Sequence, residues 1–221
     1  MLFRSSALIK NQISKGEYQA LFASEIAKIY GSRYVNLTNS GTSALHLIYK
    51  YFGIKNKSRV LVPDLTFAGT VFPLNYLLAE PIFLDINLKD FNLDINLFRE
   101  YITRERKKYT KPIWLIGVDI FGFPNDYAEL IKICKEYEVR FILDGAESLG
   151  SKHKNFGVFD SDTAITTSFN GNKIVTCGGG GAIISNSEKI FKKINFWINQ
   201  SRENTHWNEH REIGLNYRQS N

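Results

Sequence analysis

The stretch SFNGNKIVTCGGGG, residues 168–181, decides how the rest of this sequence is interpreted. It carries one lysine, Lys173, five residues after Ser168, and it ends in four consecutive glycines. Glycine lets a backbone approach a ligand closely or take a positive φ. A lysine fixed in such a loop can lose its proton more readily than a solvated one, and can then act as a nucleophile or form an imine. A solvated surface lysine is the ordinary alternative, so the meaning of Lys173 depends on its surroundings.

Length and charge limit the classes of protein that the chain can represent. Its 221 residues are enough for one large domain or two small ones, and its formal net charge is +6. The densest basic run lies between two predicted elements and consists of Arg104, Arg106, Lys107, Lys108 and Lys111. We interpret this run as a solvated loop rather than a nucleic-acid patch, and we expect no nucleic-acid partner.

The cysteines and the apolar stretches indicate a compartment. Cys134 and Cys177 lack metal-ligand spacing, and two thiols in a chain of this length suggest a reducing environment. The histidines show no ligand spacing either, so we expect no metal centre. No apolar stretch reaches the length of a membrane span, and the N-terminus lacks the layout of a signal peptide. The sequence therefore predicts a cytoplasmic protein that is not bound to a membrane.

Strand-like and helix-like segments alternate along the chain. We expect strands at 34–38, 59–62, 81–85, 113–118, 140–143, 163–167 and 182–185. We expect helices at 16–30, 68–78, 94–106, 126–138 and 187–203, and one that carries Leu45, Ile48, Tyr49 and Phe52 on one face. This alternation predicts an α/β fold with a mostly parallel sheet covered by helices on both faces.

Four candidate positions follow predicted strands directly or closely. Ser40 to Thr42, Phe67, Asp144 and Ser168 each come after a different strand. Ligands of parallel sheets bind at the carboxyl ends of the strands, so we expect these groups to meet at one edge of the sheet.

Two of these positions allow an ordinary structural interpretation. The turn Asn39–Ser43 between a strand and a helix can bind a phosphate on unpaired N–H groups, or Ser40 or Thr42 can simply cap the helix. Asp144 and Glu147 lie three residues apart after an apolar strand. Asp144 can cap a helix that starts at 145–149, or it can hold a cationic ring nitrogen or a metal. The absence of a His/Cys cluster in the sequence disfavours the metal.

Five motifs, in this order and at fitting spacing, carry a family resemblance. They are NSGTSAL (39–45), VPDLTF (62–67), DGAE (144–147), SFNGNK (168–173) and GLNYR (214–218). With them, the chain from about Lys15 onward resembles the DegT/DnrJ/StrS family of pyridoxal-phosphate-dependent sugar aminotransferases. The stretch 201–221 is most similar to members that aminate carbon 4 of a nucleotide-linked 4-keto-6-deoxy sugar.

The resemblance implies an aspartate-aminotransferase-like large domain of fold type I. This domain would occupy 31–221, after an N-terminal helical lead-in at 1–30. Family members continue past the Asn-Tyr-Arg motif into a small C-terminal domain. The chain is therefore expected to be truncated before that domain.

The resemblance also assigns roles around the cofactor ring of pyridoxal 5'-phosphate. Lys173 matches the lysine that forms the imine with the cofactor, and Asp144 matches the acid that pairs with the pyridinium nitrogen. Phe67 matches the aromatic residue that stacks on the ring. Glu147 stands where the family has Gln, Glu or His near the phenolic oxygen.

Further matches concern the cofactor phosphate. Gly41, Thr42 and Ser168 match phosphate contacts. Asn216 matches a residue that reaches the phosphate from the neighbouring subunit, so the resemblance implies a homodimer. Two positions depart from the family: Asp119 stands where members usually have His, and Gly145 replaces a common Ala.

The implied reaction moves an amino group from a donor, expected to be glutamate, to the keto carbon of a sugar nucleotide in surface polysaccharide or glycan biosynthesis. The retained Lys173 disfavours the dehydratase branch of the family, which has His there. One alternative is a truncated or non-catalytic chain that binds the cofactor or a full-length partner without turnover. Another is a Rossmann-type nucleotide binder, which is disfavoured because no Gly-x-Gly-x-x-Gly follows the first strand.

Overall fold

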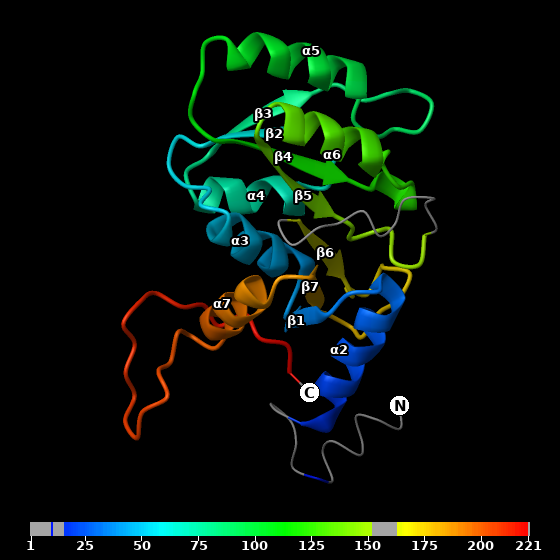
Figure 1. Cartoon of the computed structure of the whole chain (residues 1–221). Helices are drawn as coiled ribbons and strands as arrows, with labels where there is room; N and C mark the ends of the chain where they lie inside the picture. Colours follow the sequence, from blue (N-terminus) through cyan, green and yellow to red (C-terminus); the bar gives the residue numbers. More distant parts are fainter. Residues whose placement is uncertain (1–9, 11–15, 152–162, 221) are drawn as a thin grey trace.

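The computed structural model describes Lys10 and residues 16–151 and 163–220 of the chain (Figure 1). These residues form a seven-stranded sheet in the order β1-β7-β6-β5-β4-β2-β3. The strands are β1 (Tyr34–Thr38), β2 (Arg59–Pro63), β3 (Glu80–Leu84), β4 (Ile113–Val118), β5 (Val139–Asp144), β6 (Ala164–Ser168) and β7 (Gly181–Ser185). Only β7 of these strands runs against its neighbours, β1 and β6. The predicted mostly parallel sheet is confirmed, and each strand has bounds within one residue of those expected.

Helices cover both faces of the sheet. They are α2 (Glu17–Tyr30), α3 (Gly41–Tyr51), α4 (Ala68–Tyr76), α5 (Ile95–Arg106), α6 (Tyr127–Glu136) and α7 (Glu188–Ile198), with a 3-10 turn, η1, at Ile120–Gly122. One apolar cluster joins α2, α5 and α6 to the sheet, and a second joins α3, α4 and α7. Successive strand residues point to opposite faces, so Leu115 enters the first cluster while Ile116 enters the second. Strands buried on both faces explain the continuous apolar runs in the sequence.

The ends of the helices follow from local side chains. Asp94 caps α5 as expected, because its carboxylate accepts hydrogen bonds from the N–H groups of Asn96 and Leu97. Ser40, Asp126 and Ser187 cap α3, α6 and α7 in the same way. The predicted lead-in at 1–30 corresponds to α2 from Glu17 onward, and its earlier part, apart from Lys10 and Gly16, lies outside the described residues.

The last helix is shorter than its pattern predicts. We expected a helix to 203, but α7 ends at Ile198, and Gln200 and Ser201 take positive φ values of 65° and 53°. The N–H of Gln200 donates to the carbonyl of Leu215, and a Cβ on Gly214 would lie 2.1 Å from the Gln200 carbonyl carbon. The returning chain therefore takes the place of the next helical turn.

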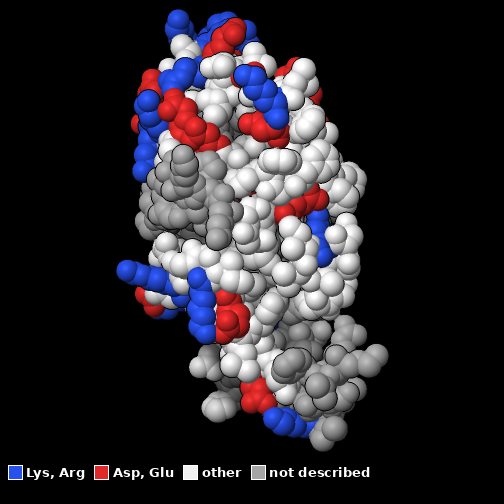
Figure 2. Space-filling model, turned by 90° about the vertical axis from the view of Figure 1, so that its right-hand side faces the viewer, with Lys and Arg blue, Asp and Glu red and all other residues white. Residues whose placement is uncertain are grey.

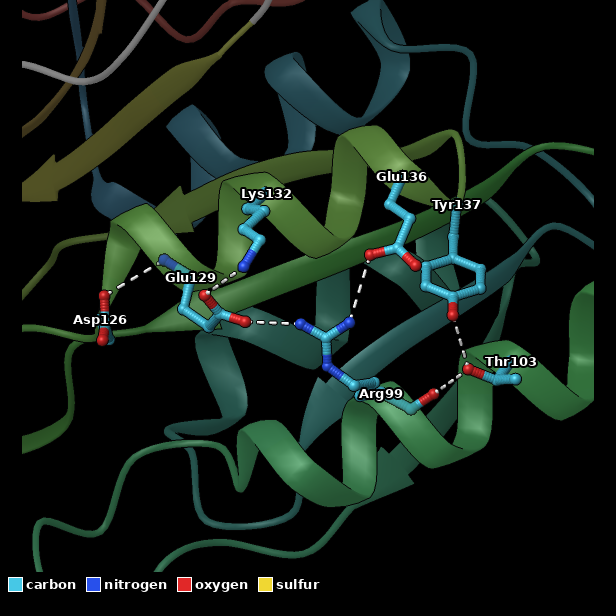
Figure 3. Close-up of polar contacts among 7 residues, drawn as sticks. All are labelled: Arg99, Thr103, Asp126, Glu129, Lys132, Glu136 and Tyr137. Carbon is cyan, nitrogen blue, oxygen red and sulfur yellow. Dashed lines mark hydrogen bonds and ion pairs between the residues drawn. The ribbon is translucent and has the colours of Figure 1, made fainter.

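The predicted basic run belongs to the outer layer of the fold. Arg106 donates hydrogen bonds to the carbonyls of Tyr137 and Glu138, so it joins the end of α5 to the end of α6. Nearby, the Arg99 guanidinium lies between Glu129 and Glu136 of α6 (Figure 3). Arg104 and Arg106 of the run therefore lie on α5 rather than in the expected loop, and Lys107, Lys108 and Lys111 follow that helix.

The charged side chains do not gather by sign on the face in Figure 2. Blue and red side chains lie beside one another at the top of that view, where Figure 1 places α5. The small positive excess therefore forms no single basic patch on that face. Among the described helices, none combines the length and apolarity that crossing a membrane requires.

Candidate active site

A cavity of about 220 Å³ lies at the carboxyl ends of the parallel strands. Seven of the eight site residues singled out in the sequence line it: Gly41, Thr42, Phe67, Asp144, Glu147, Ser168 and Lys173. The eighth, Asn216, does not line it. The edge of the sheet thus brings together residues that lie more than a hundred positions apart in the sequence.

The first turn of α3 forms one wall of the cavity. Ser40 is the N-cap, and its hydroxyl accepts the N–H of Ser43 at 3.0 Å. Gly41 and Thr42 follow it in the first turn, where a helix leaves N–H groups without intrahelical partners. The capping and phosphate-binding interpretations of this turn are therefore compatible. A helix N-terminus beside a cavity favours an anion.

Ser168 completes this wall from the end of β6. A Cβ on Gly41 would lie 2.9 Å from the Ser168 Cβ, closer than two such atoms can approach. Glycine at position 41 is therefore what lets the serine side chain lie against the start of α3. The Ser168 hydroxyl adds a hydrogen-bond donor to the anion-favouring end of the cavity.

Lys173 lies on a loop that connects two antiparallel strands. The register of β6 and β7 pairs Ser168 with Gly181, and the N–H of Phe169 donates to the carbonyl of Gly180 at 2.9 Å. A Cβ on Gly181 would lie 2.5 Å from the Ser40 carbonyl carbon. The last of the four glycines therefore lets β7 start in contact with the turn before α3.

The Lys173 side chain reaches back into the cavity from this loop. It is only 12% exposed, and its Nζ lies 3.0 Å from Oε1 of Glu147. The same Nζ lies 5.8 Å from the centre of the Phe67 ring. The second carboxylate oxygen of Glu147 accepts the N–H of Phe121 at 2.8 Å. Glu147 thus holds the lysine with one oxygen and the backbone with the other.

Asp144, the last residue of β5, is buried at the cavity and is 5% exposed. Its carboxylate accepts the Thr70 hydroxyl at 2.7 Å and the N–H of Ala146 at 3.1 Å. Burial raises the pKa of Asp144 above its ordinary value, and these hydrogen bonds and the charge of Lys173 offset only part of that effect. Residues 145–149 form turns, not the helix that the capping alternative requires. A buried carboxylate with neutral hydrogen-bond donors favours a cationic ligand group.

Phe67 and Thr70 come from the start of α4. Phe67 is the N-cap of that helix, and its side chain is 69% exposed at the cavity. A Cβ on Gly69 would lie 2.9 Å from the Thr42 hydroxyl oxygen, so the first turns of α3 and α4 are in close contact. The sequence analysis did not identify Thr70, because a threonine in a helical first turn carries no signal of its partner.

Asn216 lies away from this cavity. It pairs with Asn199 in an isolated bridge, and its carbonyl accepts the side-chain N–H of Asn39 at 3.5 Å. Its predicted contact belongs to a neighbouring subunit and stays a prediction.

The geometry agrees with the relationships of the chain to known proteins. The DegT/DnrJ/EryC1/StrS aminotransferase family matches residues 4–221. The chain is 33% identical over 208 residues to EpsN of Bacillus subtilis, covering 90% of this chain and 52% of that protein. It is 30% identical over 210 residues to GDP-perosamine synthase of Escherichia coli O157:H7, covering 94% of this chain and 56% of the synthase. The chain thus spans about half the length of these curated relatives.

Solved structures give the same relationship. A DegT DnrJ EryC1 StrS aminotransferase from Brucella abortus aligns with a TM-score of 0.90 and 26% identity, over 98% of this chain and 58% of that one. NtdA from Bacillus subtilis, solved with bound cofactor PMP, aligns with a TM-score of 0.85 and 26% identity, over 98% of this chain and 48% of that one.

Proposed function

Because this chain belongs to the DegT/DnrJ/EryC1/StrS aminotransferase family, we propose that it serves in pyridoxal-phosphate-dependent amino transfer to a sugar nucleotide. The donor is glutamate, and the acceptor is the keto carbon of a nucleotide-linked 4-keto-6-deoxy sugar, used for surface polysaccharide or other glycans. A cytoplasmic location and a homodimer are part of this proposal. The observation that carries it is the placement of Lys173 and the buried Asp144 on one cavity.

The residues of the cavity fit pyridoxal 5'-phosphate in their chemistry. The start of α3, with Gly41 and Thr42, and the Ser168 hydroxyl would hold the phosphate. The buried carboxylate of Asp144 would pair with the protonated ring nitrogen. The exposed ring of Phe67 would cover the cofactor ring.

When bound, the cofactor supplies an electrophilic carbon and a ring that withdraws electrons from the reacting centre. Asp144 favours the protonated form of the ring nitrogen, because its anionic carboxylate lies in a buried site. The Lys173 amine is the nucleophile and afterwards carries protons at its Nζ. Glu147, whose Oε1 lies 3.0 Å from the Lys173 Nζ, holds this side chain at the cavity.

The choice of substrate rests on the relatives. GDP-perosamine synthase is a sugar-nucleotide enzyme by its name, and the chain is 30% identical to it. In the proposed dimer, Asn216 of each subunit reaches the cofactor phosphate of the other. The glutamate donor rests on the family resemblance.

Covalent attachment of the cofactor tests the proposal. Purified protein mixed with pyridoxal phosphate should show the absorbance of an imine, and borohydride should fix the cofactor on the peptide that contains Lys173. Lys173→Ala should abolish this product, and Lys192→Ala, which removes an exposed lysine, should leave it unchanged. A Lys173→Ala protein that traps the cofactor as well as the wild type would refute the proposal.

Turnover needs a separate measurement. The chain is incubated with glutamate and a panel of keto-sugar nucleotides, and the amino sugar is detected by mass spectrometry. Amino transfer supports the proposed reaction. Cofactor attachment without amino transfer supports the alternative, a chain that binds the cofactor or a full-length partner without turnover.

A further inference from the structure

One buried carboxylate that lines the cavity, Asp119, has no role in the chemistry described so far. Asp119 follows the last residue of β4 and is 1% exposed. Its Oδ1 accepts the backbone and side-chain N–H groups of Asn125, at 3.0 and 2.8 Å. Its Oδ2 accepts the hydroxyls of Tyr127 and Ser148, each at 2.6 Å. Four donors surround one side chain, which suits an ionised carboxylate because that group only accepts hydrogen bonds.

These contacts join two loops at the edge of the sheet. Asn125 belongs to the loop after β4, and Ser148 belongs to the loop after β5. The backbone adds to the connection, because the N–H of Asp119 donates to the Asp144 carbonyl at 3.1 Å. Ser148 directly follows Glu147 in the chain. A change at Asp119 therefore reaches both the end of β5, where Asp144 lies, and the loop that carries Glu147.

The turn after Asp119 meets Glu147 from the other side. Phe121 has a φ of 55°, a left-handed conformation that residues other than glycine seldom adopt. In this conformation its N–H donates to Oε2 of Glu147 at 2.8 Å. A Cβ on Gly122 would lie 3.0 Å from the Glu147 carbonyl oxygen, so the turn and the loop are in close contact. Strained backbone of this kind persists where its surroundings fix it.

We propose that Asp119 is a positioning residue, which holds the Glu147 carboxylate beside the Lys173 amine through the Ser148 hydroxyl and the turn at 120–122. Asp119 does not touch the cofactor in this role. It fixes the loop on which Glu147 lies, and Glu147 then determines how firmly the lysine ammonium is held. The catalytic meaning of this arrangement rests on the proposed function, but the arrangement itself is a property of the chain without cofactor.

Two hydroxyls on the same carboxylate oxygen provide a matched pair of variants. Ser148→Ala and Tyr127→Phe each remove one 2.6 Å hydrogen bond to Oδ2 of Asp119, and both side chains are buried. Ser148 lies next to Glu147, whereas Tyr127 lies on α6. If Asp119 had only a structural role, both variants would lower the stability of the protein, and neither would change the labelling of Lys173.

The readout is the rate at which trace acetic anhydride labels Lys173 in the cofactor-free protein, measured by peptide mass spectrometry. Lys28, an exposed lysine 2.6 Å from Glu25, is the internal reference. Glu147→Gln sets the scale, because it removes the carboxylate that pairs with the Lys173 Nζ at 3.0 Å. We expect labelling of Lys173 to rise about threefold in Glu147→Gln, the size of effect that a partly exposed ion pair produces.

Ser148→Ala and Asp119→Asn should raise the labelling rate in the same direction as Glu147→Gln, and Tyr127→Phe should leave it at the wild-type value. Melting temperatures of all variants show that each is folded. The proposal is overturned if Ser148→Ala and Asp119→Asn leave the rate unchanged, if Tyr127→Phe raises it equally, or if Glu147→Gln has no effect. Failure of borohydride trapping with the expected labelling pattern would count against the proposed function alone.

Discussion

Carboxylates at the cavity and carboxylates between α5 and α6 are held in opposite ways. Asp119 and Asp144 are nearly inaccessible, and hydroxyl and amide groups donate to them. Glu129 and Glu136 have side chains that are 35% and 48% exposed, and the Arg99 guanidinium pairs with both (Figure 3). The outer acids, Glu129 and Glu136, pair with a full positive charge and are partly exposed. The inner acids, Asp119 and Asp144, depend mainly on neutral hydrogen-bond donors.

The difference is visible in the pKa values. Burial raises the pKa of Asp119 and of Asp144, and hydrogen bonds from neighbouring groups lower each only in part. The hydrogen bond from Arg99 lowers the pKa of Glu129. Ionisation of either inner acid therefore opposes folding. The outer acids modestly support the packing of two helices.

The largest expected loss of stability comes from removing Asp119, the inner acid that accepts four hydrogen bonds. Asp119→Ala removes the acceptor of four hydrogen bonds, two from Asn125 and one each from Tyr127 and Ser148, so it should cost about 3 kcal/mol or more of unfolding free energy. Urea unfolding of the cofactor-free chain measures this loss. Asp64→Ala, at an exposed acid after the neighbouring β2, is the control and should change little. Equal losses of unfolding free energy in Asp119→Ala and Asp64→Ala would contradict this difference between buried and exposed acids.

Asp144→Asn tests the second inner acid through the pH dependence of stability. Because the folded-state pKa is raised above 3.8, the wild-type carboxyl contributes stability that is present at low pH and lost as pH rises through the folded value. The cofactor-free variant should therefore gain stability relative to wild type as pH rises above about 4, and the gain should then level off. A difference that is independent of pH would refute this account.

The same variant should bind the cofactor less well. An amide lacks the negative charge that favours a protonated ring nitrogen, and hydrogen bonds to charged groups contribute about 1.5 kcal/mol or more. The affinity for pyridoxal phosphate should fall by about tenfold or more, measured by absorbance titration. Thr70→Val, which removes one donor to Asp144 and keeps its charge, should have a smaller effect.

Removing Arg99, the partner of the two outer acids, should give the smallest change in stability. Arg99→Ala removes the partner of Glu129 and Glu136 on the surface, where solvent and salt weaken ion pairs. We expect a small fall in melting temperature at low salt that shrinks further in high salt. A loss comparable to that of Asp119→Ala, or one that persists in high salt, would show that the outer cluster matters as much as the inner one.

Local sequence signals predicted most of the fold. Buried apolar runs located the strands, and Asp94 marked the start of α5. The end of α7 was predicted wrongly, because Asn199–Glu203 contains no glycine or proline that would stop a helix. The stop comes from the packing of Gly214 and Leu215 against that segment, a contact that local periodicity does not reveal.

The site was predictable where it follows the strands and not where it depends on side-chain partners. Strand ends in one sheet predict the meeting of Phe67, Asp144 and Ser168, because parallel strands end at one edge. The hydrogen bond from Thr70 to Asp144 and the four bonds to Asp119 join residues whose spacing follows no period. Such contacts depend on the three-dimensional arrangement of several loops.

The loop that carries Lys173 begins and ends on paired neighbours, since Ser168 pairs with Gly181 and Phe169 bonds to Gly180. Insertions or deletions at 170–179 would therefore leave the closing bonds in place, as in other hairpins with longer or shorter connections. The reach of the amine could then vary without disturbing the scaffold. The length of the loop is therefore separate from the wall that the start of α3 and Ser168 form.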